Sequence, residues 1–267
     1  MASPIKRARS VWFLGIASLP LILFLLLPCI GLIVRAAGYD LFALFLQKPV
    51  VDAIAISFET TLAATGLTIL FGTPVAYLLA RKSFRGKGLL EGFIDLPMVM
   101  PPAVAGLALL ILLGRRGILG SYLSQLGVQI AFTPCAVVLA QLFVASPFFV
   151  KSAAAGFIGV DRELEQSAAI DGASPWKVFR TVTVPLASPS LIGGAILTWA
   201  RALGEFGATI MFAGNFPGKT QTMPLAIYLG FEMDFSIAVT LSIILLAISF
   251  LVLFLVKGIL RRRFAIP

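Results

Sequence analysis

Residues 236–256 read SIAVTLSIILLAISFLVLFLV and contain no charged side chain. An α-helix rises about 1.5 Å per residue, so a run of this length can cross the hydrocarbon core of a bilayer, which is roughly 30 Å thick. Lipid offers the backbone no hydrogen-bond partner, and a long apolar run therefore satisfies its own backbone groups as a helix. This stretch predicts a membrane-spanning helix.

Similar apolar character recurs along the whole chain. Five further stretches are long enough to span a bilayer: residues 11–34, 54–80, 94–114, 130–150 and 190–212. Hydrophobic residues make up 59% of the 267 residues and charged residues 12%, against about 45–50% and about 25% in soluble domains. The mean hydropathy is +1.01. The sequence predicts an all-α, multi-pass membrane protein with six transmembrane helices, forming one membrane domain over residues 1–267.

The basic residues predict the orientation of these spans. Of the 21 lysines and arginines, fifteen lie before the first span, after the second and fourth spans, and after the sixth. Five lie in the flanks on the opposite side, and Arg201 lies within the fifth span. Because cytoplasmic loops are enriched in Lys and Arg, both termini and the long segment 151–189 are expected in the cytoplasm. The net charge of +9 therefore reflects topology and indicates no nucleic-acid partner.

The composition also excludes several kinds of chemistry. The chain has no histidine, which excludes a Ser-His-Asp triad, a histidine general base and a histidine-ligated zinc ion. Residues 213–220 resemble a relaxed P-loop, but Ala213 stands where a glycine is needed and a membrane span precedes the segment. We therefore expect no enzyme activity, no catalytic residue, no metal site and no cofactor.

The most polar part of the chain is the predicted cytoplasmic segment 151–189. Apolar residues recur at helical spacing around Leu164 and again around Trp176, and a break at residues 171–175 separates the two groups. Ser174 is a good N-cap, and Pro175 suits a first helical position. Two short helices joined at Gly172 are expected at the membrane surface. Loops of this length are usually functional, so a soluble intracellular partner is expected.

Residues 166–185, QSAAIDGASPWKVFRTVTVP, carry the main resemblance. They resemble the loop of ABC-transporter permeases that docks into a groove on a cytoplasmic ATPase. Gln166 stands where that family has glutamate, and Glu165 lies one place earlier. The sequence therefore leaves open whether this chain forms the salt bridge that the family's glutamate would make. The resemblance implies that this loop couples the chain to the ATPase through Glu165, Gln166, Ser167, Ala168, Asp171, Gly172, Ala173, Trp176, Phe179 and Pro185.

Physical reasoning supports several of these assignments. Gly172 permits a turn that bulkier residues resist. Ala168 and Ala173 are small enough for close approach by a partner. Trp176 and Phe179 are apolar side chains of the kind that anchor an interface. The alternative to a coupling loop is an ordinary pair of amphipathic helices at the membrane surface.

A second, narrower resemblance concerns the substrate. The stretches DLPMVMPPAVAG at 95–106, ARALGEFGAT at 200–209 and GNFPGKTQTMPLAIY at 214–228 look like those of molybdate/tungstate permeases, whose relatives carry sulfate and thiosulfate. This resemblance implies a type I ABC importer for a tetrahedral oxyanion. Its implied partners are a second copy of the chain, two cytoplasmic ABC ATPase subunits and an extracytoplasmic oxyanion-binding protein.

Four residues are candidates for the translocation pathway. Arg201 and Glu205 lie deep in the fifth span and one helical turn apart, so they can pair. Charges inside a membrane usually face an interior cavity, and the pair is either part of an anion pathway or a structural ion pair. Pro101 and Pro102 remove backbone donors from the third span and indicate either a gate or a kinked packing helix.

Other functions remain open at this point. A sulfate or thiosulfate ABC permease fits the same motifs. An ion-coupled secondary carrier would more naturally show inverted repeats and several intramembrane acids, and neither is evident. A membrane scaffold without transport activity would tolerate replacement of Gly172 and Arg201 without loss of transport.

Overall fold

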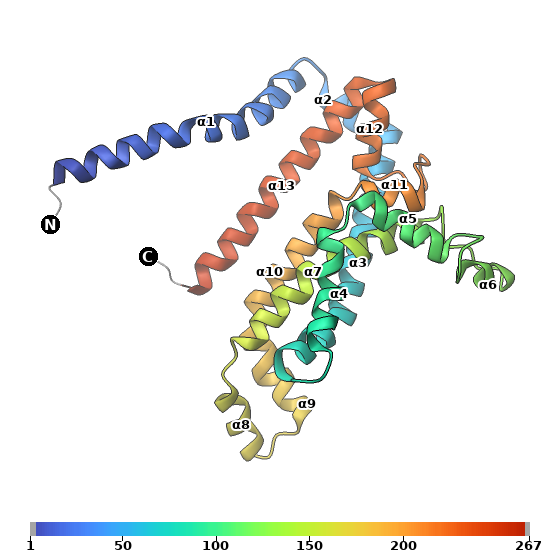
Figure 1. Cartoon of the computed structure of the whole chain (residues 1–267). Helices are drawn as coiled ribbons and strands as arrows, with labels where there is room; N and C mark the ends of the chain where they lie inside the picture. The colour runs from blue at the N-terminus through green and yellow to red at the C-terminus, as the bar shows by residue number, and fades with distance from the viewer. Residues whose placement is uncertain (1–3, 265–267) are drawn as a thin grey trace.

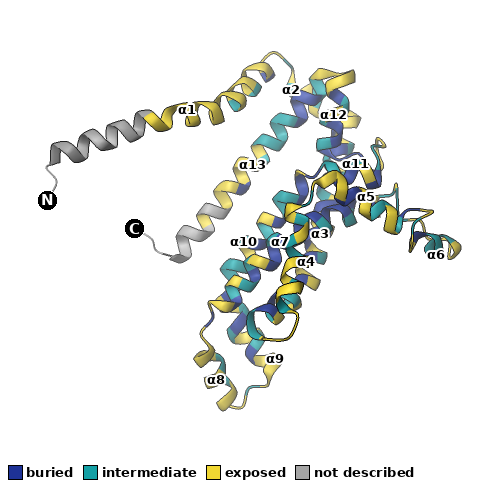
Figure 2. Ribbon diagram, viewed as in Figure 1, coloured by how far each residue is buried: buried dark blue, intermediate teal, exposed yellow. Residues whose placement is uncertain are grey.

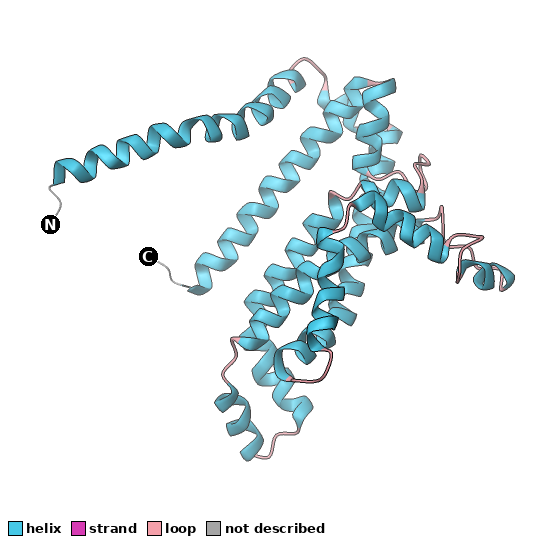
Figure 3. Ribbon diagram, in the orientation of Figure 1, coloured by secondary structure: helices cyan, strands magenta, loops and turns pink. Residues whose placement is uncertain are grey.

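The computed structural model describes the backbone of residues 4–264 and the side chains of residues 17–255 and 258. All regular elements in this part of the chain are helices (Figures 1 and 3). The long helices are α1 (Pro4–Ala36), α3 (Lys48–Arg81), α7 (Pro134–Ile158), α10 (Val184–Leu203) and α13 (Phe235–Phe264). The shorter ones are α2 (Leu41–Phe45), α4 (Lys87–Val99), α5 (Pro102–Leu113), α6 (Gly120–Gln125), α8 (Arg162–Ile170), α9 (Pro175–Val178), α11 (Gly207–Ala213) and α12 (Met223–Met233).

Helices α3, α7 and α10 form the centre of the bundle. Small residues allow α7 and α10 to approach closely, as is common where lipid-embedded helices meet. A Cβ atom added at Gly156 would lie 2.5 Å from Ser190 Cβ, and one added at Gly194 would lie 2.7 Å from Ser152 Cβ. Ser152 Oγ also donates a hydrogen bond to the carbonyl oxygen of Ser190 over 2.8 Å. The two helices are therefore held in one register.

The outer surface of the bundle is apolar. The C-terminal end of helix α1 lies near α2 and contacts α13, and the rest of α1 diverges from the bundle (Figure 1). Its described side chains are almost all exposed (Figure 2), and Phe24 is 71% exposed. Five helices are long and apolar enough to cross a membrane, and the number is six if α4 and α5 form one bent span. This surface suits lipid rather than water and confirms the predicted all-α membrane architecture.

The third predicted span is not one helix. Residues 94–114 divide between α4 and α5, whose axes differ by 115°. Met100 and Pro101, both of which precede a proline, have extended backbone with ψ values of 133° and 131°. A residue before proline is driven out of the helical region, so the consecutive prolines Pro101 and Pro102 break the helix instead of only bending it.

The fifth predicted span is also interrupted. Residues 190–212 divide between α10, which ends at Leu203, and α11, which begins at Gly207. At the other end the helix begins earlier than predicted, because α9 runs through a π-helical turn, η1 (Phe179–Thr183), directly into α10. The second short helix expected in the loop is thus the first turn of this long helix, and α8 alone is separate.

Candidate functional site

The α8–α9 segment projects from one end of the bundle, opposite the end that carries α2 and α12 (Figure 1). Gly172 ends α8 with φ +83°, a conformation that residues with a Cβ resist. Its N–H bonds to Ala169 O, and the N–H of Ala173 bonds to Ala168 O, which is the Schellman pattern of helix ends. The Ser174 hydroxyl accepts from the N–H of Lys177. The predicted turn and N-cap are confirmed.

The tip of this segment presents apolar side chains to the outside. Ile170 is 85% exposed and Trp176 is 69% exposed. Trp176 stacks on Phe179, with ring centroids 5.5 Å apart. Phe179 itself packs edge-to-face on Tyr77 of α3 at 5.1 Å and is half-buried. Trp176 is therefore available to a partner, whereas Phe179 supports it from inside the chain and is not a free anchor.

A buried ion pair fixes the α8 segment to the bundle. Arg81 Nη2, at the end of α3, donates to Glu165 Oε1 over 2.9 Å and to the carbonyl oxygen of Val160 over 3.1 Å. Thr183 Oγ1, at the end of the π-helical turn, donates to the same Glu165 oxygen over 2.6 Å. The Arg81 and Glu165 side chains are only 8% and 16% exposed. One carboxylate therefore joins α3, α8 and the start of α10.

The other predicted residues of the loop lie on its surface. Ala168 and Ala173 are half-buried at the turn, and the exposed ones are Gln166, Ser167, Asp171 and Pro185.

Arg201 and Glu205 form the predicted ion pair, with Arg201 Nη2 and Glu205 Oε2 2.8 Å apart. The Arg201 side chain is 30% exposed, whereas Glu205 is 1% exposed. The second carboxylate oxygen, Oε1, accepts from the N–H of Ala208 over 2.8 Å. Glu205 therefore has two tasks: it holds the arginine and it caps the first turn of α11 after the interruption at residues 204–206.

The interruptions of the third and fifth spans lie beside each other. A Cβ atom added at Gly207 would lie 2.7 Å from Pro102 Cβ, and one added at Gly106 would lie 2.6 Å from the carbonyl oxygen of Ala208. Helices α5 and α11 therefore meet backbone to backbone. Pro102, which follows the first break, and Glu205, within the second, belong to one structural unit, which also carries Pro101 and Arg201.

Residues 68–265 match the family described as the binding-protein-dependent transport system inner membrane component. The chain belongs to this family. It is a multi-pass membrane protein, and its long apolar helices agree with a position in the membrane.

Relatives of this inner membrane component include permeases named for molybdenum. The chain is 41% identical over 254 residues to the molybdenum transport system permease protein ModB of Mycobacterium tuberculosis, with 94% of each chain covered. It is 42% identical to ModB of Escherichia coli K12, with 69% of this chain and 81% of that protein covered. A probable sulfate transport system permease protein of Chlorokybus atmophyticus is 35% identical, with coverages of 88% and 83%.

Solved transporters share the fold. A bacterial alginate ABC transporter, crystallised with an alginate-bound periplasmic protein, contains a chain that matches with a TM-score of 0.71. The identity is 20%, and 96% of each chain is covered. At this identity the likeness establishes the architecture alone.

Sequence reasoning missed three residues of this inner membrane component. Arg81 lies among the basic residues that follow the second predicted span, and nothing local indicates that it pairs with Glu165 far along the chain. Thr183 lies within the motif at residues 166–185, and nothing in that motif indicates its contact with Glu165. Ile170 could have been predicted as a contact residue, because it lies directly before a polar turn, where an apolar side chain is exposed unless a partner covers it. Two glycines that flank Glu205, at 204 and 207, were a signal for the break in the fifth span.

Proposed function

We propose that the chain is the membrane-spanning permease subunit of an ATP-driven ABC importer for molybdate, with tungstate as a close analogue. The 41% identity to a molybdenum transport permease, which extends over 94% of the chain, carries this proposal. The chain would act as a single transmembrane permease domain, with both termini in the cytoplasm. A separate subunit would hydrolyse ATP, which agrees with the absence of any sequence motif for that chemistry in the chain.

The α8–α9 segment is the proposed contact with the ATPase. Exposed Ile170 and Trp176 form its apolar tip, and buried aromatic anchors dominate the energy of most interfaces. The Arg81–Glu165–Thr183 contacts link this tip to α3 and α10. A force applied to the tip when the ATPases close would therefore move α3 and α10 instead of deforming the loop.

The paired interruptions in the third and fifth spans are the proposed gate region of the pathway. Irregular backbone at membrane depth occurs where it lines a cavity or is covered by protein. Arg201 is partly exposed and fixed by Glu205, so it can offer a positive charge to a passing oxyanion. A tight contact with the anion is not required, because selection would occur mainly in an extracytoplasmic binding protein.

The proposed assembly contains two copies of this chain, two cytoplasmic ABC ATPases and one extracytoplasmic oxyanion-binding protein. Two-fold symmetric dimers are the commonest homo-oligomers among soluble proteins, and two equal copies of this chain would enclose one pathway between them. Sulfate or thiosulfate is the second candidate substrate, favoured by the sulfate permease relative at 35% identity.

Cellular molybdenum content tests this proposal. A strain that lacks the gene would be grown on limiting molybdate, with molybdenum measured by elemental mass spectrometry and labelled-sulfate uptake measured beside it. The proposal predicts a fall in molybdenum alone, restored by the wild-type gene. Reduced sulfate uptake with normal molybdenum would transfer the assignment to sulfate. Unchanged values for both anions, in a strain without a redundant transporter, would overturn it.

A further inference from the structure

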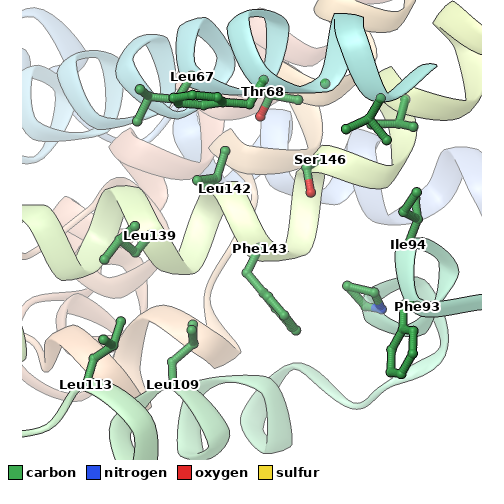
Figure 4. A pocket seen from close by; sticks show the side chains of 15 residues that line it. Leu67, Thr68, Phe93, Ile94, Leu109, Leu113, Leu139, Leu142, Phe143 and Ser146 are labelled. Carbon is green, nitrogen blue, oxygen red and sulfur yellow. The ribbon is translucent and has the colours of Figure 1, made fainter. Parts of the chain in front are cut away.

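An apolar groove runs between α3, α4, α5 and α7. Its volume is about 460 Å³, within the range of roughly 300–1,000 Å³ typical of ligand sites. Figure 4 shows Phe143 reaching from α7 into this space, with Leu109 and Leu113 on one side and Phe93 on another. The polar side chains that line it, Thr68 and Ser146, are small. Such a lining suits a hydrocarbon chain and does not suit a dianion.

A charged hollow continues this groove at the end of the bundle that carries α8. The hollow has a volume of about 350 Å³ and shares Ile94 and Val150 with the apolar groove. Lys151 Nζ lies 2.8 Å from Asp95 Oδ2, and the Lys87 ammonium lies 3.9 Å from the Glu91 carboxylate. Two ammonium groups and two carboxylates thus line the mouth of an apolar slot.

One oxygen in this mouth is left without a partner. Asp95 Oδ1 is buried and has no hydrogen-bond partner among the described residues, although Oδ2 is paired. This oxygen has almost no exposed surface, so a ligand in the hollow would meet the exposed parts of the charged side chains instead: Glu91 is 49% exposed, Asp95 38% and Lys151 54%. These groups suit a ligand that donates N–H or O–H to a carboxylate and also presents a negative charge to the lysines.

We propose that this groove binds a phospholipid with a primary amine in its headgroup, such as phosphatidylethanolamine. An acyl chain occupies the apolar groove, the phosphate lies between Lys87 and Lys151, and the ammonium donates to Asp95 and Glu91. A choline headgroup has no N–H to donate, and a glycerol headgroup brings no positive charge to the two carboxylates. Charge complementarity therefore selects the amine-bearing lipid over both.

Native mass spectrometry of the purified, delipidated full-length protein tests this inference. The protein would be titrated separately with phosphatidylethanolamine, phosphatidylcholine and phosphatidylglycerol. The inference predicts one tightly retained phosphatidylethanolamine per chain, with retention about tenfold above that of the other two, because one charge-assisted hydrogen bond is worth about 1.5 kcal/mol. Equal retention of the three lipids by the wild-type protein would overturn it, and this comparison needs no variant.

Variants separate the headgroup site from the acyl groove. Asp95→Asn should remove the preference for the ethanolamine headgroup, and Ser146→Phe should lower retention of all three lipids by filling the groove. Glu163→Gln and Lys82→Met, on exposed side chains outside the groove, should change nothing. An unaltered lipid profile in both groove variants would contradict the site. So would efficient disulfide formation between two chains from cysteines placed at Phe93 and Leu142, because a second copy would then fill the groove.

Discussion

The guanidinium of Arg81, the last residue of α3, lies 2.9 Å from the carboxylate of Glu165 on α8, and both side chains are largely buried. The two residues are far apart in the sequence and belong to different parts of the molecule, the bundle and its projecting tip. Because Thr183 donates to the same carboxylate, the tip is held at two points. This contact is the structural basis for the proposed transmission of force from the ATPase.

Removal of Arg81 should uncouple the two parts of the transporter. In Arg81→Ala the Glu165 carboxylate is left largely buried without its cation, which costs about 3 kcal/mol. We expect ATP hydrolysis by the assembled complex to continue while substrate uptake per ATP falls. The ratio of uptake to hydrolysis in proteoliposomes measures this effect. Arg85→Ala, on an exposed side chain of the next loop, serves as the control. An unchanged ratio in Arg81→Ala would argue against a transmitting role.

The turn at Gly172 should tolerate only residues that accept a positive φ. A Cβ atom there meets nothing within 4 Å, so the cost of substitution is conformational and amounts to about 1–2 kcal/mol. Asparagine visits this region more readily than β-branched residues. Uptake should therefore fall in the order wild type, Gly172→Asn, Gly172→Val. Gly193→Ala is the matched control, because its Cβ also meets nothing within 4 Å but its φ is ordinary. Equal uptake in the valine and asparagine variants would contradict the need for this turn.

Trp176 should be a dominant contact for the ATPase. Truncation of an anchoring tryptophan typically costs about 2 kcal/mol, which is about 30-fold in Kd. We expect Trp176→Ala to weaken binding of the purified ATPase subunit by this factor, and Ile170→Ala to weaken it less. Phe231→Ala is the control, since Phe231 is equally exposed, at 69%, on α12. Unaltered binding in Trp176→Ala would show that the ATPase docks elsewhere.

Substitutions at Arg201 and Glu205 distinguish an anion pathway from a structural ion pair. Arg201→Lys keeps the positive charge and Arg201→Ala removes it, so a pathway role predicts a larger loss of uptake for alanine. In Glu205→Gln the amide oxygen can still cap α11, but the ion pair is lost. Uptake at several substrate concentrations, with thermal stability recorded in parallel, separates the two roles. Equal losses of uptake in both arginine variants, matched by equal losses of stability, would assign the pair to structure alone.

The features that follow from local sequence were predictable. Apolar runs of bilayer length indicated the spans, and Ser174 and Gly172 marked the ends of the loop helices. The four-residue spacing of Arg201 and Glu205 predicted their ion pair, although Glu205 lies beyond the end of α10. The sequence predicts a gate or a kink at Pro101 and Pro102, whereas the residues before these prolines are driven out of the helical region and the helix breaks. The break at residues 204–206 is not predicted, because residues 190–212 are apolar enough to form one span. The contact of Arg81 with Glu165, and the inward packing of Phe179 on Tyr77, depend on the tertiary arrangement of three helices, which no local pattern specifies.

The most direct test of the proposed function is molybdate uptake into proteoliposomes that contain the chain with its ATPase and binding protein. The account predicts accumulation of molybdate only when ATP and both partners are present, and loss of accumulation in Gly172→Val although the complex still assembles. Accumulation by the chain alone, driven by an ion gradient and indifferent to ATP, would contradict it and would identify a secondary carrier.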